Sequence, residues 1–413
     1  MKRLVQRLNR SLPFDAWGLG HEDDSRARAI RHWINTQRWH RFPLFSRWAW
    51  KLCLRGLWLL WCPYRTWRLA AMLRLMGKPT HRWRAVANGW LYAHKPVEEL
   101  APALQFGQMP ALEVGHLRDN HWLMLWPLLG QRTSLLLAQD KLALAEKLAS
   151  MGLPVPHLIK ELPKGCLVGL HDLLGTEPQK LFIKPRHGNR AEGAMSLRRL
   201  ATDRWRVNED SMWSDTTLLQ RLTQLAAADS MLLQPCLKPA RDTLDLSPQV
   251  PLLLRITTAH SPDGQAFVHS SYLRIQVPHQ HASVRLENMF VVPIEPGSGL
   301  MEFGFRLSEP ERRFEAVPWN VAPIAGRTIP RYQEAEAMVL AASRALPGVP
   351  VLGWDVLLTD CGPVILETNT GLSWRLMHLR HAITGAKSAL PALIERWLAA
   401  PSSSLALATD VER

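Results

Sequence analysis

The spacing of apolar positions divides the chain into segments with predictable secondary structure. Apolar side chains recur at helical spacing through residues 135–156 until Gly152 and Pro154, which predicts a helix followed by an extended strand. Residues 332–348 predict a further helix. Strands are predicted for four apolar runs, at residues 180–184, 252–259, 265–277 and 284–294. We therefore expect an antiparallel sheet in the later half of the chain.

A β-hairpin is predicted for residues 351–370, where two apolar runs flank the sequence Asp-Cys-Gly at 360–362. A three-residue loop is natural there, with Gly362 in the left-handed position. Thr359 would then face Pro363, and this pairing sets the register of the whole hairpin.

That register brings three oxygen-bearing side chains together. Asp355 lies opposite Glu367, and Asn369 follows two residues later on the same face. Two neighbouring buried carboxylates repel each other unless a cation or a proton lies between them. Oxygen ligands of this kind suit Mg²⁺, which usually shares its coordination shell with phosphate. The residues alone leave a second interpretation open, in which one carboxylate is exposed at a strand end and the other pairs with an arginine.

A polar, basic loop follows the strand that ends at Lys184. Gly188 and Gly193 lie within nine residues of that lysine. Such a loop can direct backbone N–H groups at phosphate oxygens while the lysine supplies a point charge. The chain contains neither a Walker A string nor G-x-G-x-x-G at this place. An ordinary β-turn with surface arginines therefore stays open as the alternative.

Charge separates the first 90 residues from the rest. Residues 1–90 hold 18 Lys and Arg against 4 Asp and Glu, together with 10 of the 18 tryptophans. Residues 91–413 hold 32 of each sign. The longest apolar run in this head, residues 56–62, is far shorter than the roughly 20 residues that a spanning helix needs. The head could lie on an anionic membrane surface or fold as a packed helical subdomain, and nucleic acid is disfavoured because no nucleic-acid-binding motif accompanies the charge.

The five cysteines are scattered and never form a C-x-x-C pair. Neither a disulfide framework nor a zinc ribbon is supported, and we expect a reducing, cytoplasmic setting. Arg7 and Arg10 interrupt the N-terminal apolar positions, so a secretory signal is not expected. The length of 413 residues allows more than one domain.

The order of these motifs resembles the ATP-grasp superfamily. Asp140-Lys141 at a helix start, GLPVP, FIKP with its glycine-containing loop, LLQPCL, LRITT and GWDV…GPVILETN follow one another in the sequence. The last two look most like the sugar-transfer-associated ATP-grasp group found in polysaccharide gene neighbourhoods. The resemblance covers about residues 130–385. It implies an α+β fold in which two α+β subdomains clasp ATP, preceded by a mainly helical, basic extension.

The domains expected from this resemblance follow the chain in order. They are a basic Trp-rich helical extension (1–90), a linker or pre-ATP-grasp region (91–139), a first subdomain with the phosphate flap (140–237), a second subdomain with the Mg²⁺ site (238–398) and a mobile tail (399–413).

The resemblance also implies a role for each matching residue. Two lysines would touch the ATP phosphates, the loop 187–193 would form a flap over them, residues 234–237 would read adenine by their backbone, and one aspartate would contact the ribose. The ATP-binding residues are thus Lys141, Lys184, His187, Gly188, Gly193, Gln234, Cys236, Leu237 and Asp242. Mg²⁺ would be held by Asp355, Glu367 and Asn369, and Arg255 and Arg274 would stabilise charge on the transferred phosphoryl group.

Three departures from the family pattern accompany these roles. Pro235 removes one backbone donor from the adenine-binding segment, the flap is poor in glycine, and ETNT replaces the more usual Glu-Gly-Asn. Glu and Asn nevertheless keep their two-residue spacing, so Mg²⁺ binding stays the expectation.

The function implied is an ATP- and Mg²⁺-dependent ligase that activates a substrate carboxylate as an acyl phosphate. Its substrate would be a small molecule or a precursor of a cell-surface polysaccharide, handled in the cytoplasm or at the inner membrane face through residues 1–90. Two alternatives remain: a phosphotransferase of the same fold, and a non-catalytic membrane or assembly factor. The sequence does not give the oligomeric state.

Overall fold

The structure is a computed structural model. It describes residues 44–75, 83, 86–87, 129–166, 180–187, 193–201, 203–208, 211–247, 252–276, 289–306, 309–370, 372, 376 and 389–400. The chain divides into one unit of residues 1–130, 305–313 and 371–413, and a second of residues 131–304 and 314–370. Gly188, residues 284–288 of one expected strand, most of the expected linker 91–139, and the tail beyond residue 400 lie outside the described residues.

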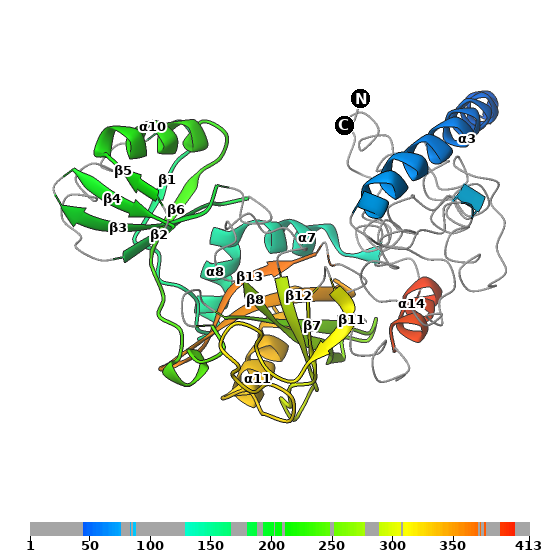
Figure 1. Cartoon of the computed structure of the whole chain (residues 1–413). Coiled ribbons are helices and arrows are strands. Elements are labelled where there is room, and N and C mark those ends of the chain that lie inside the picture. The colour runs from blue at the N-terminus through cyan, green and yellow to red at the C-terminus, as the bar shows by residue number, and fades with distance from the viewer. Residues whose placement is uncertain are drawn as a thin grey trace. The chain divides into compact units, whose positions relative to one another are not determined.

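The first unit contains the long helix α3 (Leu44–Leu75) and the short helix α14 (Leu390–Ala399), drawn in blue and red in Figure 1. Most of the strands β10 (Gly304–Arg306) and β11 (Glu309–Phe314) also falls within its residues. Helix α3 confirms helical structure for residues 44–75 of the expected extension.

In the second unit, a six-stranded sheet follows the order β1-β6-β2-β3-β4-β5, with every neighbouring pair antiparallel. Its strands are β1 (Lys160–Leu162), β2 (Lys180–Pro185), β3 (Met195–Ala201), β4 (Arg204–Val207), β5 (Ser211–Trp213) and β6 (Met231–Pro235). Helix α10 (Asp215–Ala226) runs along this sheet in Figure 1 and buries Leu218 and Leu222 in a core that includes Trp205. Ser214 caps the start of this helix, because its hydroxyl oxygen accepts a hydrogen bond from the backbone N–H of Thr217.

Five further strands of this unit are hydrogen-bonded neighbours in the antiparallel order β9-β8-β7-β12-β13. They are β7 (Leu253–His260), β8 (Ala266–Gln276), β9 (Met289–Ile294), β12 (Val351–Thr359) and β13 (Gly362–Asn369). Helices α7 (Arg132–Gln139), α8 (Lys141–Ser150) and α11 (Tyr332–Ser343), and the 3₁₀ turn η2 (Arg241–Thr243), complete the described elements. The predicted antiparallel sheet and the helix at residue 332 are confirmed.

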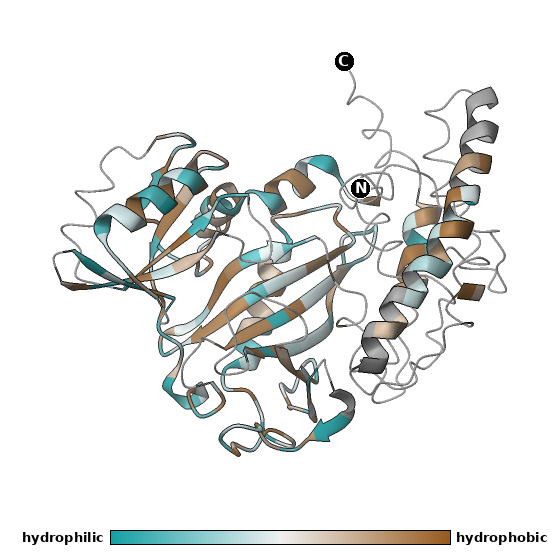
Figure 2. Cartoon of the chain, turned by 45° about the horizontal axis from the view of Figure 1, so that its top comes forward, coloured by the Kyte–Doolittle hydropathy of each residue, from teal (hydrophilic) through white to brown (hydrophobic). Residues whose placement is uncertain are grey.

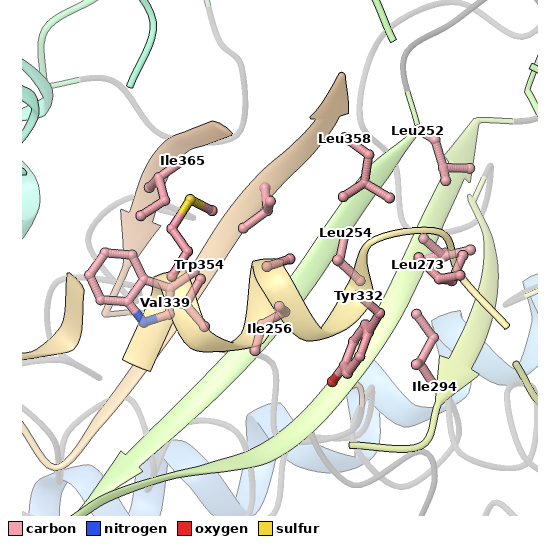
Figure 3. Packing of buried hydrophobic residues seen from close by; sticks show 14 of the residues in the cluster. Leu252, Leu254, Ile256, Leu273, Ile294, Tyr332, Val339, Trp354, Leu358 and Ile365 are labelled. Atoms are coloured by element: carbon pink, nitrogen blue, oxygen red, sulfur yellow. The ribbon is translucent and has the colours of Figure 1, made fainter. Parts of the chain in front are cut away.

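Apolar and more polar residues alternate along several of these strands in Figure 2. Because successive side chains of a strand point to opposite faces, this alternation gives the sheet an apolar face and a polar face. Ile256, Leu273 and Trp354 belong to the buried apolar face. Tyr332 and Val339 of α11 pack in the same cluster (Figure 3). The side chains that lie between those apolar residues along each strand point to the other face of the sheet.

The single helix predicted for residues 135–156 is wrong in its extent. Asp140 has extended backbone angles (φ −96°, ψ 101°) and separates α7 from α8. Its carboxylate accepts the N–H groups of Leu142 and Ala143, both at 3.1 Å, so the side chain caps a new helix in place of continuing the old one. The expected strand directly after Pro154 is also absent from the described residues, because β1 begins only at Lys160.

The predicted hairpin loop is one residue too long. Thr359 pairs with Gly362, not with Pro363, so the loop between β12 and β13 has two residues. Two-residue loops match the right-handed twist of the flanking strands, which favours them over longer connections. Gly362 keeps a positive φ of 131°, but as a paired strand residue.

A β-bulge restores the predicted register at the carboxylates. The pairing shifts between Asp355 and Val356, so that Val356 lies opposite Ile365 while Asp355 lies opposite Glu367. Leu366 is the extra residue of the bulge. The prediction that Asp355 faces Glu367 is therefore confirmed, although it rested on a wrong loop.

The turn after β9 provides a matched test of packing against backbone strain. Gly299 has a φ of 73°, and a Cβ at this position would lie 2.6 Å from Cβ of Tyr332. Gly297 has a φ of 82°, and a Cβ there would meet no atom within 4 Å. We expect Gly297→Ala to lower the free energy of unfolding by about 1 kcal/mol through strain, and Gly299→Ala to lower it by about 2–4 kcal/mol because overpacking adds to the strain.

Urea denaturation of both variants beside the unchanged protein measures this difference. Equal losses in the two variants would show that Tyr332 does not pack tightly over this turn.

Candidate functional site

The polar face of the second sheet carries a row of four side chains on adjacent strands. Tyr272 on β8 pairs with Arg255 on β7, Arg255 pairs with Asp355 on β12, and Asp355 pairs with Glu367 on β13. Three of the four are nearly inaccessible to solvent, with 4% of Tyr272, 8% of Arg255 and 4% of Asp355 exposed. A polar row buried to this degree must be paired within the protein or with a ligand.

Arg255 and Asp355 form a bidentate ion pair. Arg255 Nη2 donates to Asp355 Oδ2 at 2.9 Å, and Arg255 Nε donates to Oδ1. Nη1 of Arg274 lies 3.8 Å from Asp355 Oδ2. Burial is the largest influence on the pKa of Asp355 and raises it, but the two arginines and a hydrogen bond with the Glu367 carboxyl together hold this pKa below 3.8. Asp355 is therefore ionised at neutral pH, and the arginine pairing that the sequence left open for one carboxylate is present.

Both predicted lysines converge on the second carboxylate. Lys141 Nζ lies 3.8 Å from Glu367 Oε2, and Lys184 Nζ donates to the backbone oxygen of Leu366 at 3.3 Å. Burial is the largest influence on the pKa of Lys184 and lowers it, Glu367 and Asp355 raise it, and Lys141 lowers it; the resulting pKa is about 8. The structure thus brings Lys141, Lys184, Asp355 and Glu367 into one cluster, although α8, β2 and the hairpin lie far apart in the sequence.

The oxygen donors of this cluster fit a Mg²⁺ ion. Glu367 and Asn369 lie on the same side of β13, and Nδ2 of Asn369 is buried with no hydrogen-bond partner among the described residues. A phosphate oxygen beside the ion would accept from that amide. Asp355 gives both oxygens to Arg255, but a carboxylate offers about four lone-pair sites and can still serve a cation. The described residues contain no cluster of three or more His, Cys, Asp or Glu side chains placed to bind a metal, so the amide oxygen of Asn369 and the phosphates would have to complete such a site.

An arginine that the sequence did not single out joins α8 to the first sheet. Arg186 donates through Nε and Nη2 to the two carboxylate oxygens of Asp140, at 2.7 and 2.6 Å, and through Nη1 to Glu161 at 2.9 Å. Its carbonyl accepts the N–H of Lys141. Burial raises the pKa of Asp140, but Arg186 and the backbone of α8 lower it to about 2. Arg186 thereby fixes the helix start that carries Lys141 beside the strand that carries Lys184.

The expected phosphate flap is described only at its two ends. The backbone N–H and Nδ1 of His187 contact the carboxylate of Asp229, at 2.7 and 2.9 Å, and 54% of the imidazole is exposed. Gly193 has a φ of 79°, and a Cβ there would lie 3.1 Å from both Leu225 and Pro185. A contact of either residue with phosphate stays a prediction, as does that of Gly188.

The expected adenine-binding segment follows β6. Gln234 is buried in the strand, where it pairs with Phe182. The N–H of Cys236 donates to the carbonyl of Lys180 at 2.8 Å, so this amide is used by the sheet and could not also read a nucleotide base. Pro235 has no N–H. These two facts remove Pro235 and Cys236 from the expected backbone donors, and a contact of Gln234 or Leu237 with a base stays a prediction.

Asp242 lies in η2, near the turn of the β12–β13 hairpin. The neighbouring Arg241 donates its N–H to the Asp360 side chain at 2.9 Å, and Arg327 donates to the Asp242 carbonyl at 2.8 Å. Asn369 lies at the opposite end of the same hairpin. A contact of Asp242 with a ribose stays a prediction.

The family model described as sugar-transfer-associated ATP-grasp matches residues 124–384. The chain belongs to this family. Its fold is therefore the ATP-grasp fold, and all the clustered residues lie inside the matched region. No curated protein matches the sequence.

Solved ATP-binding enzymes share low sequence identity with this ATP-grasp chain. N5-carboxyaminoimidazole synthetase from Staphylococcus aureus, complexed with ADP, is 12% identical with a TM-score of 0.35, over 58% of this chain and 47% of that one. D-alanine–D-alanine ligase from Bacillus anthracis, complexed with ATP, is 13% identical with a TM-score of 0.36, over 65% and 68%. Biotin carboxylase from Campylobacter jejuni is 11% identical with a TM-score of 0.42, over 66% and 49%. The chain thus spans about half the length of the first and third of these enzymes.

The buried ion pair makes Asp355 and Glu367 unequal for stability. Asp355→Asn leaves Arg255 as a buried unpaired charge, which we expect to lower the free energy of unfolding by about 3–5 kcal/mol. Glu367 is 29% exposed at its side chain, so Glu367→Gln should change stability by less than about 1 kcal/mol. Chemical denaturation compares the two variants. The double variant Arg255→Met with Asp355→Leu removes both charges and should recover most of the loss; similar stabilities for the two single variants would contradict the pairing.

Lys184 carries a charge at neutral pH in a place that disfavours it. Its pKa is about 8 in the folded protein and 10.5 in the unfolded chain, so the unfolded chain binds more protons between these values. The charge of Lys184 therefore destabilises the folded protein below pH 8, and this cost is lost as the pH rises across that window. We expect Lys184→Met to raise the free energy of unfolding by about 2 kcal/mol at pH 7, with the gain shrinking above pH 8.

Denaturation of both proteins at pH 7 and pH 9.5 tests this expectation. A variant that is less stable than the parent at pH 7 would show that the contact with the Leu366 carbonyl outweighs the cost of burying the charge.

Proposed function

We propose that the chain is an ATP- and Mg²⁺-dependent ligase that activates a carboxylate as an acyl phosphate. The observation that carries the proposal is the convergence of two lysines beside the ionised Asp355, with Lys141 at the Glu367 carboxylate and Lys184 at the adjoining Leu366 carbonyl. Two cations and two carboxylates at one point suit a ligand that has both negative oxygens and a bound divalent cation, as a nucleoside triphosphate does.

Each member of the cluster has a distinct task in this proposal. Lys141 and Lys184 offset the charge of the phosphates and hold them in place. Glu367 and Asn369, with the remaining lone pairs of Asp355, would hold Mg²⁺, which supplies charge neutralisation at the β- and γ-phosphates. Glu367 and Asn369 could bind the ion without any rearrangement of the ion pair between Arg255 and Asp355.

The two arginines divide the role that the family resemblance gave them jointly. Arg255 is committed to Asp355 and acts as a positioning residue for that carboxylate. Arg274 lies at the edge of the pair, 3.8 Å from Asp355, and 18% of its side chain is exposed. Arg274 is therefore the better candidate for contact with the transferred phosphoryl group.

The reaction proceeds in two displacements. A substrate carboxylate oxygen attacks the γ-phosphorus of ATP, the bond to the β-phosphate oxygen breaks, and ADP leaves. An amine then attacks the carbonyl carbon of the acyl phosphate, loses a proton and expels inorganic phosphate. Both steps need positioning and electrostatic stabilisation more than a protein nucleophile.

The family description supports a substrate connected with sugar transfer, such as a precursor of a cell-surface polysaccharide. All five cysteines are described, and each is a free thiol. Free thiols are consistent with the reducing, cytoplasmic setting proposed for this chemistry.

Hydroxylamine trapping tests the proposed intermediate. Incubation with ATP, Mg²⁺ and a panel of carboxylates should release ADP and give a hydroxamate for the true substrate, because hydroxylamine attacks an acyl phosphate. Glu367→Gln should reduce the rate by at least about 100-fold through lost stabilisation of the phosphoryl transfer.

Glu334→Gln is the control and should keep the full rate, because this exposed glutamate belongs to α11, the helix that packs against the apolar face of the sheet and not its polar face. A stable phosphomonoester in place of the hydroxamate would identify a kinase and contradict the ligase. Unchanged activity in Glu367→Gln would reject the site.

A further inference from the structure

Helix α3 exposes an apolar stripe between Cys53 and Ala71. Six exposed positions recur at alternating spacings of three and four residues, which places them on one side of an α-helix. We call the following set the exposed stripe: Cys53, Leu57, Leu60, Tyr64, Trp67 and Ala71. Exposure reaches 56% at Leu57, 78% at Leu60 and 57% at Tyr64. An apolar row this long is unusual on a surface that only water contacts.

The helix uses a different side for its packing within the protein. Trp58, Cys62, Thr66 and Ala70 recur every fourth residue and are all buried. The hydroxyl of Thr66 donates to the carbonyl of Cys62 at 2.8 Å, so the polar atom on this side is satisfied inside the helix. The helix therefore already packs against the protein through one side, and the exposed stripe is a second apolar side that faces the surface.

Aromatic side chains cluster at one end of the exposed stripe. Trp67 and Trp83 meet edge to face with ring centroids 5.0 Å apart, and 70% of Trp83 is exposed. Tyr64 lies one turn earlier on the same side. Tryptophan and tyrosine favour the boundary between lipid chains and headgroups, because each combines an apolar ring with a polar atom.

Charge favours an anionic occupant for this surface. Residues 44–75 contain six Lys and Arg and no Asp or Glu, and no basic residue falls at a position of the exposed stripe. A second copy of the same helix would bring like charges together and meet repulsion. An anionic lipid surface instead attracts each basic residue near it, by about 1 kcal/mol.

We propose that α3 docks on an anionic lipid bilayer, lying in its plane with the exposed stripe among the headgroups. No helix in the described part of the chain is both long enough and apolar enough to span a membrane, which agrees with an in-plane helix. The inference goes beyond the proposed ligase activity and does not rest on it.

Vesicle sedimentation with the full chain tests the docking without any nucleotide. The probes are phosphatidylcholine vesicles with and without phosphatidylglycerol. The chain should bind the anionic vesicles, and binding should weaken as salt rises. The variant Leu57→Gln/Leu60→Gln/Tyr64→Gln, which keeps every charge, should bind at least about 100-fold more weakly because three apolar side chains no longer enter the lipid.

The matched control changes three exposed apolar residues outside α3, as Leu136→Gln/Met212→Gln/Val321→Gln, and should bind like the parent. Equal binding of neutral and anionic vesicles, or undiminished binding of the stripe variant, would overturn the proposal. A concentration-dependent dimer in analytical ultracentrifugation that the stripe variant abolishes would assign the stripe to a second copy and overturn it as well.

Discussion

The ion pair between Arg255 and Asp355 is the interaction on which the polar face of the second sheet depends. Asp355 lies beside Glu367 on the neighbouring strand, and two adjacent carboxylates out of water would repel each other strongly if both were ionised. Arg255 donates two hydrogen bonds to the Asp355 carboxylate, and this pairing offsets much of the cost of its buried charge. Glu367 is consequently left to face Lys141, and the site keeps one carboxylate fixed and one able to bind a ligand.

The same cluster favours an anionic ligand because Lys184 holds its charge in an unfavourable setting. Lys184 is buried close to Lys141, and both effects oppose its charge. A protein gains no stability from such a pair, but a polyphosphate that enters would relieve the repulsion and restore the usual pKa of the amine. Arg186 keeps Lys141 and Lys184 close together, because its hydrogen bonds to Asp140 hold the start of α8 against the end of β2. The buried charge of Lys184 thus lowers the stability of the fold and at the same time favours the binding of an anion.

The basic head, residues 1–90, is a separate feature and is proposed to bind its partner through different interactions from those of the polar cluster. The family match begins at residue 124, whereas α3 ends at Leu75, so the exposed stripe lies outside the matched region that holds the proposed nucleotide site. The proposed site would act through a few fixed charges in a buried place, where electrostatic interactions are strong. A lipid surface is recognised through area and diffuse charge, which tolerate variation in any single residue. The chain would combine localisation by α3 with chemistry in the matched region.

Periodicity alone determined the antiparallel strands, because alternation along a strand is a local property of the sequence. The pairing of Asp355 with Glu367 came from an assumed three-residue loop, whose one-residue error the β-bulge cancels. Periodicity could not place the bulge, since a one-residue shift leaves the apolar pattern near the loop almost unchanged. Periodicity also missed the break at Asp140, because a capping carboxylate competes with helix continuation only in the right surroundings. The family resemblance had placed a helix start at Asp140-Lys141, and α8 confirms it. The partners of Arg255 and Arg186 were decided by the tertiary structure. Which carboxylate a buried guanidinium meets depends on strands brought together from distant parts of the chain, and no local pattern encodes that distance.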